Sequence, residues 1–199
     1  MKIAITGHTQ GIGAALTEYF AEQGHEVKGF SRSNGYDIGQ ETDRNRIADE
    51  SQDCDVFINN ATHEFAQTYL LFKFHDMWAG LDKTIINLSS HATERWFNVH
   101  QDHRVRTFKK SLDDTSYYLR NLNPLPNIML INPCIIDTPR AGHLGSDVIP
   151  HKVSPESLAR FIDFCLTNPE FKIFHVLMGN QGGDARYDML NHDLSSIAR

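Results

Sequence analysis

The sequence predicts an α/β fold in which helices cover both faces of one parallel sheet, that is, a doubly wound parallel sheet. Short apolar segments alternate with longer helical segments along nearly the whole chain, as expected for successive strand-helix-strand units. The strand segments are apolar at consecutive positions, which is typical of a sheet covered on both faces. The 199 residues contain no internal repeat and no low-complexity linker. We therefore expect a single domain spanning residues 1–199.

The first part of the chain contains four predicted strands, each followed by a predicted helix. The first helix carries an apolar stripe at helical spacing and ends at Gly24, a residue that commonly terminates helices. The predicted strands are 3–5, 26–30, 55–58 and 84–88, and the predicted helices are 11–23, 40–49, 65–78 and 103–120.

The second part adds two predicted strands, 127–131 and 173–178, with a helix between them. Ser154 is expected to cap this helix and Pro155 to occupy its first turn, because these residue types are preferred at those positions. The least regular segments are 137–152 and the tail after Gly179. Ligands of such sheets bind at the carboxyl ends of the strands, and every motif considered below follows a strand.

Composition and charge exclude several classes of protein. Hydrophobic residues make up 40% and charged residues 22% of the chain, which is an ordinary globular composition. The 19 Lys and Arg against 25 Asp and Glu give a net charge of -6, which argues against a nucleic-acid-binding face. No apolar run approaches the ~20 residues of a membrane span, and the N-terminal segment does not resemble a secretory signal. Three widely spaced cysteines favour a reducing compartment, so we expect a cytoplasmic protein that binds neither nucleic acid nor membrane.

A glycine-rich turn, TGHTQGIG at residues 6–13, links the first strand to the first helix. Gly7 permits the tight turn, Gly11 allows close approach of a pyrophosphate, and Gly13 allows the helix to pack on the sheet. The helix N-terminus adds free N–H groups and the positive end of its dipole. Such a turn also serves as a plain connection, but its place in the first strand-helix-strand unit favours dinucleotide binding. The expected contacts come from Thr6, Gly7, Thr9, Gln10, Gly11, Ile12 and Gly13.

Four motifs in this order resemble the short-chain dehydrogenase/reductase family. TGHTQGIG resembles the family's TGxxxGIG fingerprint, and Asn59-Asn60-Ala61 resembles its NNA motif. INLSS at 86–90 is similar to the strand that carries the active-site serine, and NPCIIDTP at 132–139 to the NPGxxxTP segment. The resemblance covers most of the chain. It implies a Rossmann-type fold, an NAD(P) cofactor and an oxidoreductase activity, and it is compatible with a homo-oligomer. It also implies cofactor contacts from Asn59, Asn60, Ala61, Pro133, Ile135 and Thr138.

The loop after the second strand bears on which dinucleotide is bound. An acidic residue there accepts hydrogen bonds from the 2′-hydroxyl of NAD, whereas a basic residue pairs with the 2′-phosphate of NADP. Here the segment reads Ser31-Arg32-Ser33, with no carboxylate before Asp37, so we expect NADP, with NAD less favoured. A solvated loop arginine is the alternative interpretation of Arg32. Asp37 and the aliphatic residue after it are similar to the family's pair near the adenine ring.

The catalytic segment departs from the family pattern. In the family a serine orients the substrate, a tyrosine transfers the proton, and a lysine four residues later lowers the pKa of the tyrosine and holds the nicotinamide ribose. Ser90 and Lys109 match the serine and the lysine, but Val105 stands at the tyrosine position. Shifting the alignment by one residue places Arg106 there instead. Neither alignment places a tyrosine where the family has its proton donor.

Three interpretations of this departure stay open at this stage. The protein binds NADP without the usual chemistry, as a sensor or structural protein; or water relays the proton; or a histidine supplies it, with His103, His100 and His91 nearest in sequence. Each histidine taken alone is better interpreted as a surface residue in a polar loop. We expect an NADP(H)-dependent oxidoreductase of low activity on a small carbonyl or alcohol, with the non-catalytic protein as the alternative. No Cys or carboxylate cluster accompanies the histidines, so we expect no metal.

Overall fold

Six parallel strands form one sheet in the computed structural model, which describes residues 1–93, 103–141, 152–168 and 170–179. The strand order is β2-β1-β3-β4-β5-β6, and every registered pair is parallel. The strands are β1 (Lys2–Thr6), β2 (Glu26–Phe30), β3 (Val56–Asn59), β4 (Thr84–Leu88), β5 (Asn127–Asn132) and β6 (His175–Leu177). The predicted doubly wound parallel sheet is confirmed.

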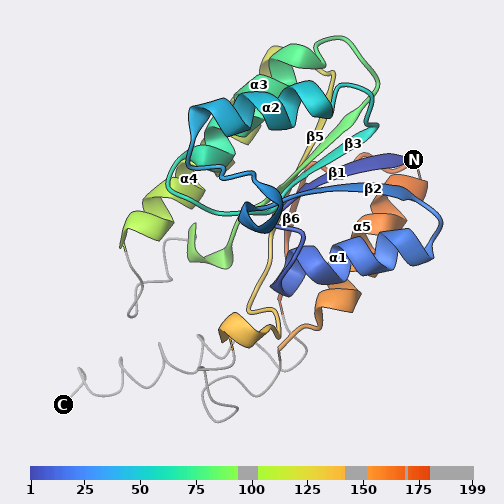
Figure 1. Cartoon of the computed structure of the whole chain (residues 1–199), viewed down its shortest axis with the longest axis vertical. Helices are drawn as coiled ribbons and strands as arrows, with labels where there is room; N and C mark the ends of the chain where they lie inside the picture. The colour runs from blue at the N-terminus through green and yellow to red at the C-terminus, as the bar shows by residue number, and fades with distance from the viewer. Residues whose placement is uncertain (94–102, 142–151, 169, 180–199) are drawn as a thin grey trace, which may run out of the picture.

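Five α-helices of the described residues lie on the two faces of the sheet (Figure 1). Helices α1 and α5 cover one face, and α2, α3 and α4 cover the other. The helices are α1 (Gly11–Glu22), α2 (Glu41–Glu50), α3 (Ala66–Met77), α4 (His103–Leu122) and α5 (Pro155–Thr167), and three short 3-10 turns are η1 (Arg32–Asn34), η2 (His91–Thr93) and η3 (Pro139–Ala141).

Two apolar clusters, one on each face, hold the helices to the sheet. Successive strand residues alternate between them: Ile3 and Ile5 pack under α1 and α5, whereas Ala4 faces the other three helices. On that second face the Phe57 and Phe74 rings stack with their centroids 3.6 Å apart. Burial on both faces explains why the strands are apolar at consecutive positions.

The helix and strand predictions agree with the structure within a few residues, and the largest difference is at the edge of the sheet. The last strand was predicted over 173–178, but β6 spans only His175–Leu177 and its two end residues are exposed. It has a neighbour on one side only, and none of its three residues is buried. Ser154 caps α5 as predicted, because its Oγ accepts a hydrogen bond from the Ser157 N–H (3.0 Å). No helix of the described residues is long and apolar enough to cross a membrane.

The sheet reverses its winding between β1 and β3. The chain leaves β1 toward β2 on one side and returns to β3 on the other side. The loops that follow these two strands therefore diverge and leave a crevice at their carboxyl ends, the usual ligand site of open parallel sheets.

Gly13 illustrates how tightly the first helix packs against the first turn. A Cβ at this position would overlap the Gly7 carbonyl oxygen and lie 2.7 Å from Asn60 Nδ2. Helix propensity alone favours alanine over glycine by about 1 kcal/mol, whereas overpacking costs roughly 1–3 kcal/mol. For alanine at position 13, the cost of overpacking is therefore expected to exceed the gain in helix propensity.

We predict that Gly13→Ala lowers the free energy of unfolding by about 1–2 kcal/mol, measured by urea denaturation. A variant that is more stable than the wild-type protein would show that the turn can relax, and would contradict this packing.

Candidate functional site

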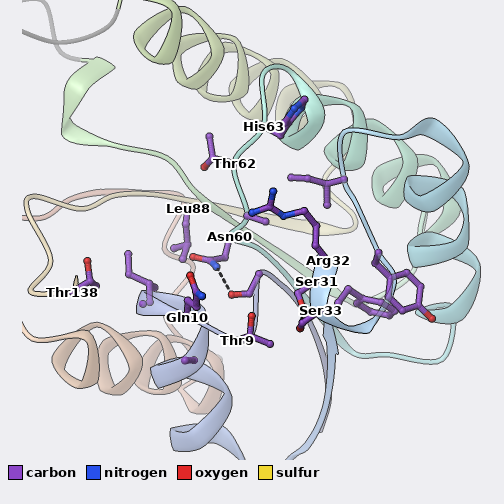
Figure 2. A pocket seen from close by; sticks show the side chains of 18 of the residues that line it. Thr9, Gln10, Ser31, Arg32, Ser33, Asn60, Thr62, His63, Leu88 and Thr138 are labelled. Atoms are coloured by element: carbon purple, nitrogen blue, oxygen red, sulfur yellow. Dashed lines mark hydrogen bonds between the residues drawn. The ribbon is translucent and has the colours of Figure 1, made fainter. Parts of the chain in front are cut away.

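A pocket of about 1030 Å³ opens at the carboxyl ends of the strands, above the point where the winding reverses. Residues that follow β1, β2, β3, β4 and β5 line it, together with Lys109 of α4. Figure 2 shows Gln10 of the first turn, Arg32 after β2, Thr62 after β3 and Thr138 after β5 around this pocket. Segments far apart in the sequence therefore form one site.

The first turn is held against the end of β3 by a set of part-buried hydrogen bonds. Thr6 Oγ1 accepts from the backbone N–H groups of Asn60 (3.0 Å) and Ala61 (3.1 Å). In return, Asn60 Nδ2 donates to the Thr6 carbonyl oxygen (2.9 Å). Gly7 and Gly11 have φ values of +72° and +55°, a backbone region that glycine adopts at low cost. These contacts fix the turn at the mouth of the pocket.

The N-terminus of α1 faces the pocket. Gln10 is its N-cap residue but makes no side-chain capping bond, so the first-turn N–H groups are not satisfied by that side chain. Such groups and the positive end of the helix dipole attract anions. Gly11 and Ile12 line the pocket at this point, which is consistent with a phosphate-binding role for the turn.

At the β2 end of the pocket, η1 presents a cation between two hydroxyls. Ser31 Oγ and Ser33 Oγ lie 2.7 Å apart, and the Arg32 side chain is exposed and points into the pocket (Figure 2). Among the described residues no carboxylate pairs with Arg32. The nearby Asp37 is engaged locally, because its Oδ1 accepts from the Gly39 N–H (2.9 Å).

At the β4 end, Lys109 brings a second cation into the pocket from α4. Its side chain is buried, and its Nζ donates to Gln67 Oε1 (2.7 Å) and to the Leu88 carbonyl oxygen (2.8 Å). Val105 lies one helical turn before Lys109 and is 37% exposed. It does not line the pocket, so the pocket wall near Lys109 carries no phenol at the family's tyrosine position.

The two serines after β4 differ from their predicted arrangement. Ser89, not Ser90, lines the pocket, and its Oγ is buried. The Ser90 carbonyl oxygen accepts hydrogen bonds from Thr93 Oγ1 (3.0 Å) and Asn132 Nδ2 (3.3 Å). These bonds tie the end of β4 and η2 to the end of β5.

A buried carboxyl, Asp113, lies behind these serines and was not singled out from the sequence. Asn132 Nδ2 donates to its Oδ2 (3.0 Å), and the hydroxyls of Ser89 and Thr93 lie beside the same carboxyl. Burial raises the pKa of Asp113, and the neighbouring hydroxyls and the Asn132 amide oppose that rise only in part. Its position on the Lys109 face of α4 could have indicated burial, because 109, 112, 113 and 116 follow helical spacing.

Most of the predicted cofactor residues line the pocket, but four of them and the predicted catalytic serine do not. Thr6, Gly13 and Asn59 lie beneath it: Thr6 and Asn59 are fully buried and bond to the polypeptide, and Gly13 packs on the first turn. Ser90 and Ile135 also do not line it. The predicted residues that do are Gly7, Thr9, Gln10, Gly11, Ile12, Ser31, Arg32, Ser33, Asp37, Asn60, Ala61, Lys109, Pro133 and Thr138.

Sequence reasoning missed several residues of the pocket wall. Phe30 and Tyr36 line its β2 end beside the predicted Ile38, and the Phe30 and Tyr36 rings meet edge to face at 4.9 Å. Thr62 and His63 line it after β3. The NNA motif directly before Thr62 was a usable signal, because residues just beyond a strand end lie at the same edge as the motif itself.

The candidate proton donors lie in different environments. His103 is exposed at the first residue of α4 and does not line the pocket, while His100 is outside the described residues. The surface interpretation of His91 is wrong: this residue is buried in η2, and its backbone N–H donates to the Pro133 carbonyl oxygen (3.1 Å). Tyr117 is two helical turns beyond Lys109, and its hydroxyl forms a hydrogen bond with His175 Nδ1 of the edge strand (2.6 Å).

The described residues contain no group of His, Cys, Asp or Glu that could hold a metal ion.

Comparisons with known proteins identify the fold. No family model and no curated protein matches the sequence. Among solved structures, a short-chain dehydrogenase from Burkholderia cenocepacia J2315 in complex with NADP is 19% identical, with 98% of this chain and 95% of that chain covered and a TM-score of 0.74. A 4-hydroxyisoleucine dehydrogenase complexed with NADH is 15% identical over 92% of this chain and 99% of that chain, with a TM-score of 0.75.

A third match also contains a nicotinamide cofactor. L-Sorbose reductase from Gluconobacter frateurii, complexed with NADPH and L-sorbose, is 18% identical over 92% of this chain and 97% of that chain, with a TM-score of 0.70. This chain therefore has the fold of short-chain dehydrogenase/reductases, over nearly the whole length of those proteins. The bound cofactors of the three structures include both NADP(H) and NADH.

Asp113 yields a prediction about stability and pH. Its raised folded-state pKa means that the folded protein binds this proton more tightly than the unfolded chain, whose aspartates titrate near pH ~3.9. The contribution of Asp113 to the stability of the wild-type protein should therefore fall as pH rises from about 4 through the raised pKa. Asp113→Asn removes this loss and supplies an N–H for Ser89 Oγ. We predict that the difference in unfolding free energy between Asp113→Asn and wild type shifts in favour of the variant between about pH 4 and pH 7.

Urea denaturation across this range measures the difference, and Asp114→Asn, an exposed neighbour on α4, controls for the loss of one negative charge. A variant whose deficit grows as pH rises would show that the ionised carboxylate stabilises the fold, contrary to this account.

Proposed function

We propose that the protein is an NADP(H)-dependent oxidoreductase that acts on a small carbonyl or alcohol substrate. The observation that carries the proposal is the order of charged groups along one pocket. Arg32 follows β2, the N-terminus of α1 follows β1, and Lys109 lies at the end of β4 beyond β3. NADP(H) presents matching groups in the same order: the 2′-phosphate on the adenosine ribose, the pyrophosphate and the nicotinamide ribose.

Each part of the pocket has a role in this proposal. Arg32, with Ser31 and Ser33, would bind the 2′-phosphate through charge-assisted hydrogen bonds. The first-turn N–H groups of α1 would bind the pyrophosphate. Lys109 would donate to the hydroxyls of the nicotinamide ribose. Solved structures with the same fold contain NADP, NADPH or NADH, and they support a nicotinamide dinucleotide as the ligand.

The bound cofactor would supply or accept a hydride, and the chain must then supply or accept a proton. The Lys109 ammonium, fixed at the pocket wall, would stabilise negative charge that develops on a substrate oxygen. Thr138 brings a hydroxyl to the pocket wall and would orient that oxygen. Without a tyrosine at position 105 the proton transfer lacks the usual general acid, which typically contributes about 10²–10⁴-fold. We therefore propose a slow enzyme rather than an efficient one.

The cofactor assignment predicts that NADPH binds more tightly than NADH. An exposed guanidinium-phosphate pair is expected at the lower end of the roughly 1.5–3 kcal/mol typical of charged hydrogen bonds, so the preference should be about tenfold. Arg32→Ala should erase most of it while leaving NADH affinity nearly unchanged, as measured by fluorescence titration with both cofactors. Arg160→Ala on α5, which removes the same charge outside the pocket, serves as the control. Equal affinities of the wild-type protein for both cofactors would refute the role of Arg32.

The position of Val105 yields a prediction about catalysis. A phenol placed one turn before Lys109 would have its pKa lowered by the ammonium. Val105→Tyr should therefore raise NADPH-dependent reduction of a panel of small aldehydes and ketones, by up to ~10²–10⁴-fold. Val105→Phe adds the same ring without the hydroxyl and is the matched control. Equal rates for the Tyr and Phe variants, with NADPH still bound, would favour a protein that binds the cofactor without reducing a carbonyl.

A further inference from the structure

Gln67, at the start of α3, is the most extensively bonded polar side chain beneath the pocket. It is 3% exposed. Its Nε2 donates to the carbonyl oxygens of Asn59 (2.7 Å) and Leu88 (3.1 Å). Its Oε1 accepts from Lys109 Nζ (2.7 Å) and from Thr62 Oγ1 (3.2 Å). An amide has two N–H donors and two acceptor sites on its oxygen, so this side chain is fully satisfied.

The partners fix the orientation of this amide. Two of them are carbonyl oxygens, which only accept, and therefore the NH₂ group must face the ends of β3 and β4. The Lys109 ammonium only donates, and therefore the Gln67 oxygen must face it. Exchanging the two ends of the amide would bring carbonyl oxygen toward carbonyl oxygen and N–H toward ammonium. The hydrogen-bond pattern is thus compatible with one orientation only.

This amide also controls where the ammonium lies. Two of the three Lys109 N–H donors bond Gln67 Oε1 and the Leu88 carbonyl oxygen, and Gln67 Nε2 bonds that same carbonyl. Gln67, Lys109 and the end of β4 thus form a closed triangle at the pocket wall. Helices α3 and α4, which carry the two side chains, lie on the same face of the sheet (Figure 1).

The chemical type of the partner matters as much as its position. A carboxylate at position 67 would neutralise Lys109, whereas an amide oxygen accepts its hydrogen bond and leaves the positive charge of the ammonium uncompensated by that contact. We propose that Gln67 is a positioning residue that holds Lys109 in its cofactor-binding orientation without itself neutralising the ammonium. This inference rests on the proposed function, because it assigns the Lys109 contact to NADP(H).

A double-mutant cycle on NADPH affinity tests the inference. Gln67→Met keeps the length of the side chain and removes its hydrogen bonds, and Lys109→Met removes the ammonium. We expect Gln67→Met to weaken NADPH binding about tenfold and Lys109→Met by about 10- to 100-fold. If Gln67 acts through Lys109, the double variant should bind NADPH as Lys109→Met does. If the loss of NADPH affinity in the double variant equals the product of the losses in the two single variants, the inference is overturned.

A matched control separates positioning from general damage to the buried network. The Ser116 side chain is buried on α4 and accepts from Asn87 Nδ2 (3.1 Å), and Asn87 Oδ1 accepts in turn from Asn59 Nδ2 (2.9 Å). Ser116 belongs to the same network but does not contact Lys109 in it. Ser116→Ala should lower the melting temperature and leave NADPH affinity within about twofold of wild type. A loss of affinity as large as that of Gln67→Met would contradict the positioning role.

A measurement on the protein without cofactor keeps this inference distinguishable from the proposed function. Reductive methylation followed by mass spectrometry reports how accessible each lysine is. Gln67→Met should increase methylation of Lys109 relative to exposed Lys172, because the ammonium loses its hydrogen bond to Gln67 Oε1. Unchanged methylation would overturn the positioning role even if NADPH binds. Increased methylation in a protein that binds neither NADPH nor NADH would support the positioning of Lys109 and refute the cofactor assignment.

Discussion

The buried hydroxyl of Thr6 is the contact on which the rest of the site depends. It lies at the end of β1 and accepts hydrogen bonds from two successive backbone N–H groups that follow β3. These two strands are adjacent in the sheet, but the chain between them runs through β2 on the other side. The Thr6 hydroxyl therefore joins the two loops that diverge at the reversal point. The glycine turn, the N-terminus of α1 and the NNA segment take their relative positions from this junction.

A network of neutral polar side chains continues from this junction across the sheet. Asn59, Gln67 and Asn87 are buried side by side and bond one another or the strand ends, and the network ends at Ser116 of α4. Burying several amides is costly unless every group is satisfied. Here the buried amide atoms have partners except Asn59 Oδ1, and the network brings a lysine ammonium to the wall of an otherwise apolar and hydroxyl-lined region.

The fold could be predicted from the sequence because its signals are local. Consecutive apolar residues and glycine stops mark the strands and helices, and the boundaries shift by at most two residues. Strand β6 is shorter than predicted at both ends, because little burial defines this edge strand. The site was predictable where a residue follows a strand directly, as Arg32 and Asn60 do. It was not predictable where burial decides the role: Thr6 and Asn59 belong to motifs yet bond the polypeptide beneath the pocket. Gln67 and Asp113 carry no motif, and their roles follow from contacts with residues more than fifteen positions away.

The central claim is that one dinucleotide occupies the pocket from Arg32 to Lys109, and amide NMR spectra recorded while NADPH is added test it most directly. The account predicts shifts of the backbone signals of Gly11, Ile12, Arg32 and Ser33 and of residues around Lys109, because these residues line the pocket. Signals of the exposed face of α5 and of β6 should remain in place. Shifts confined to residues outside the pocket, or spectra that do not change at millimolar NADPH, would contradict the account.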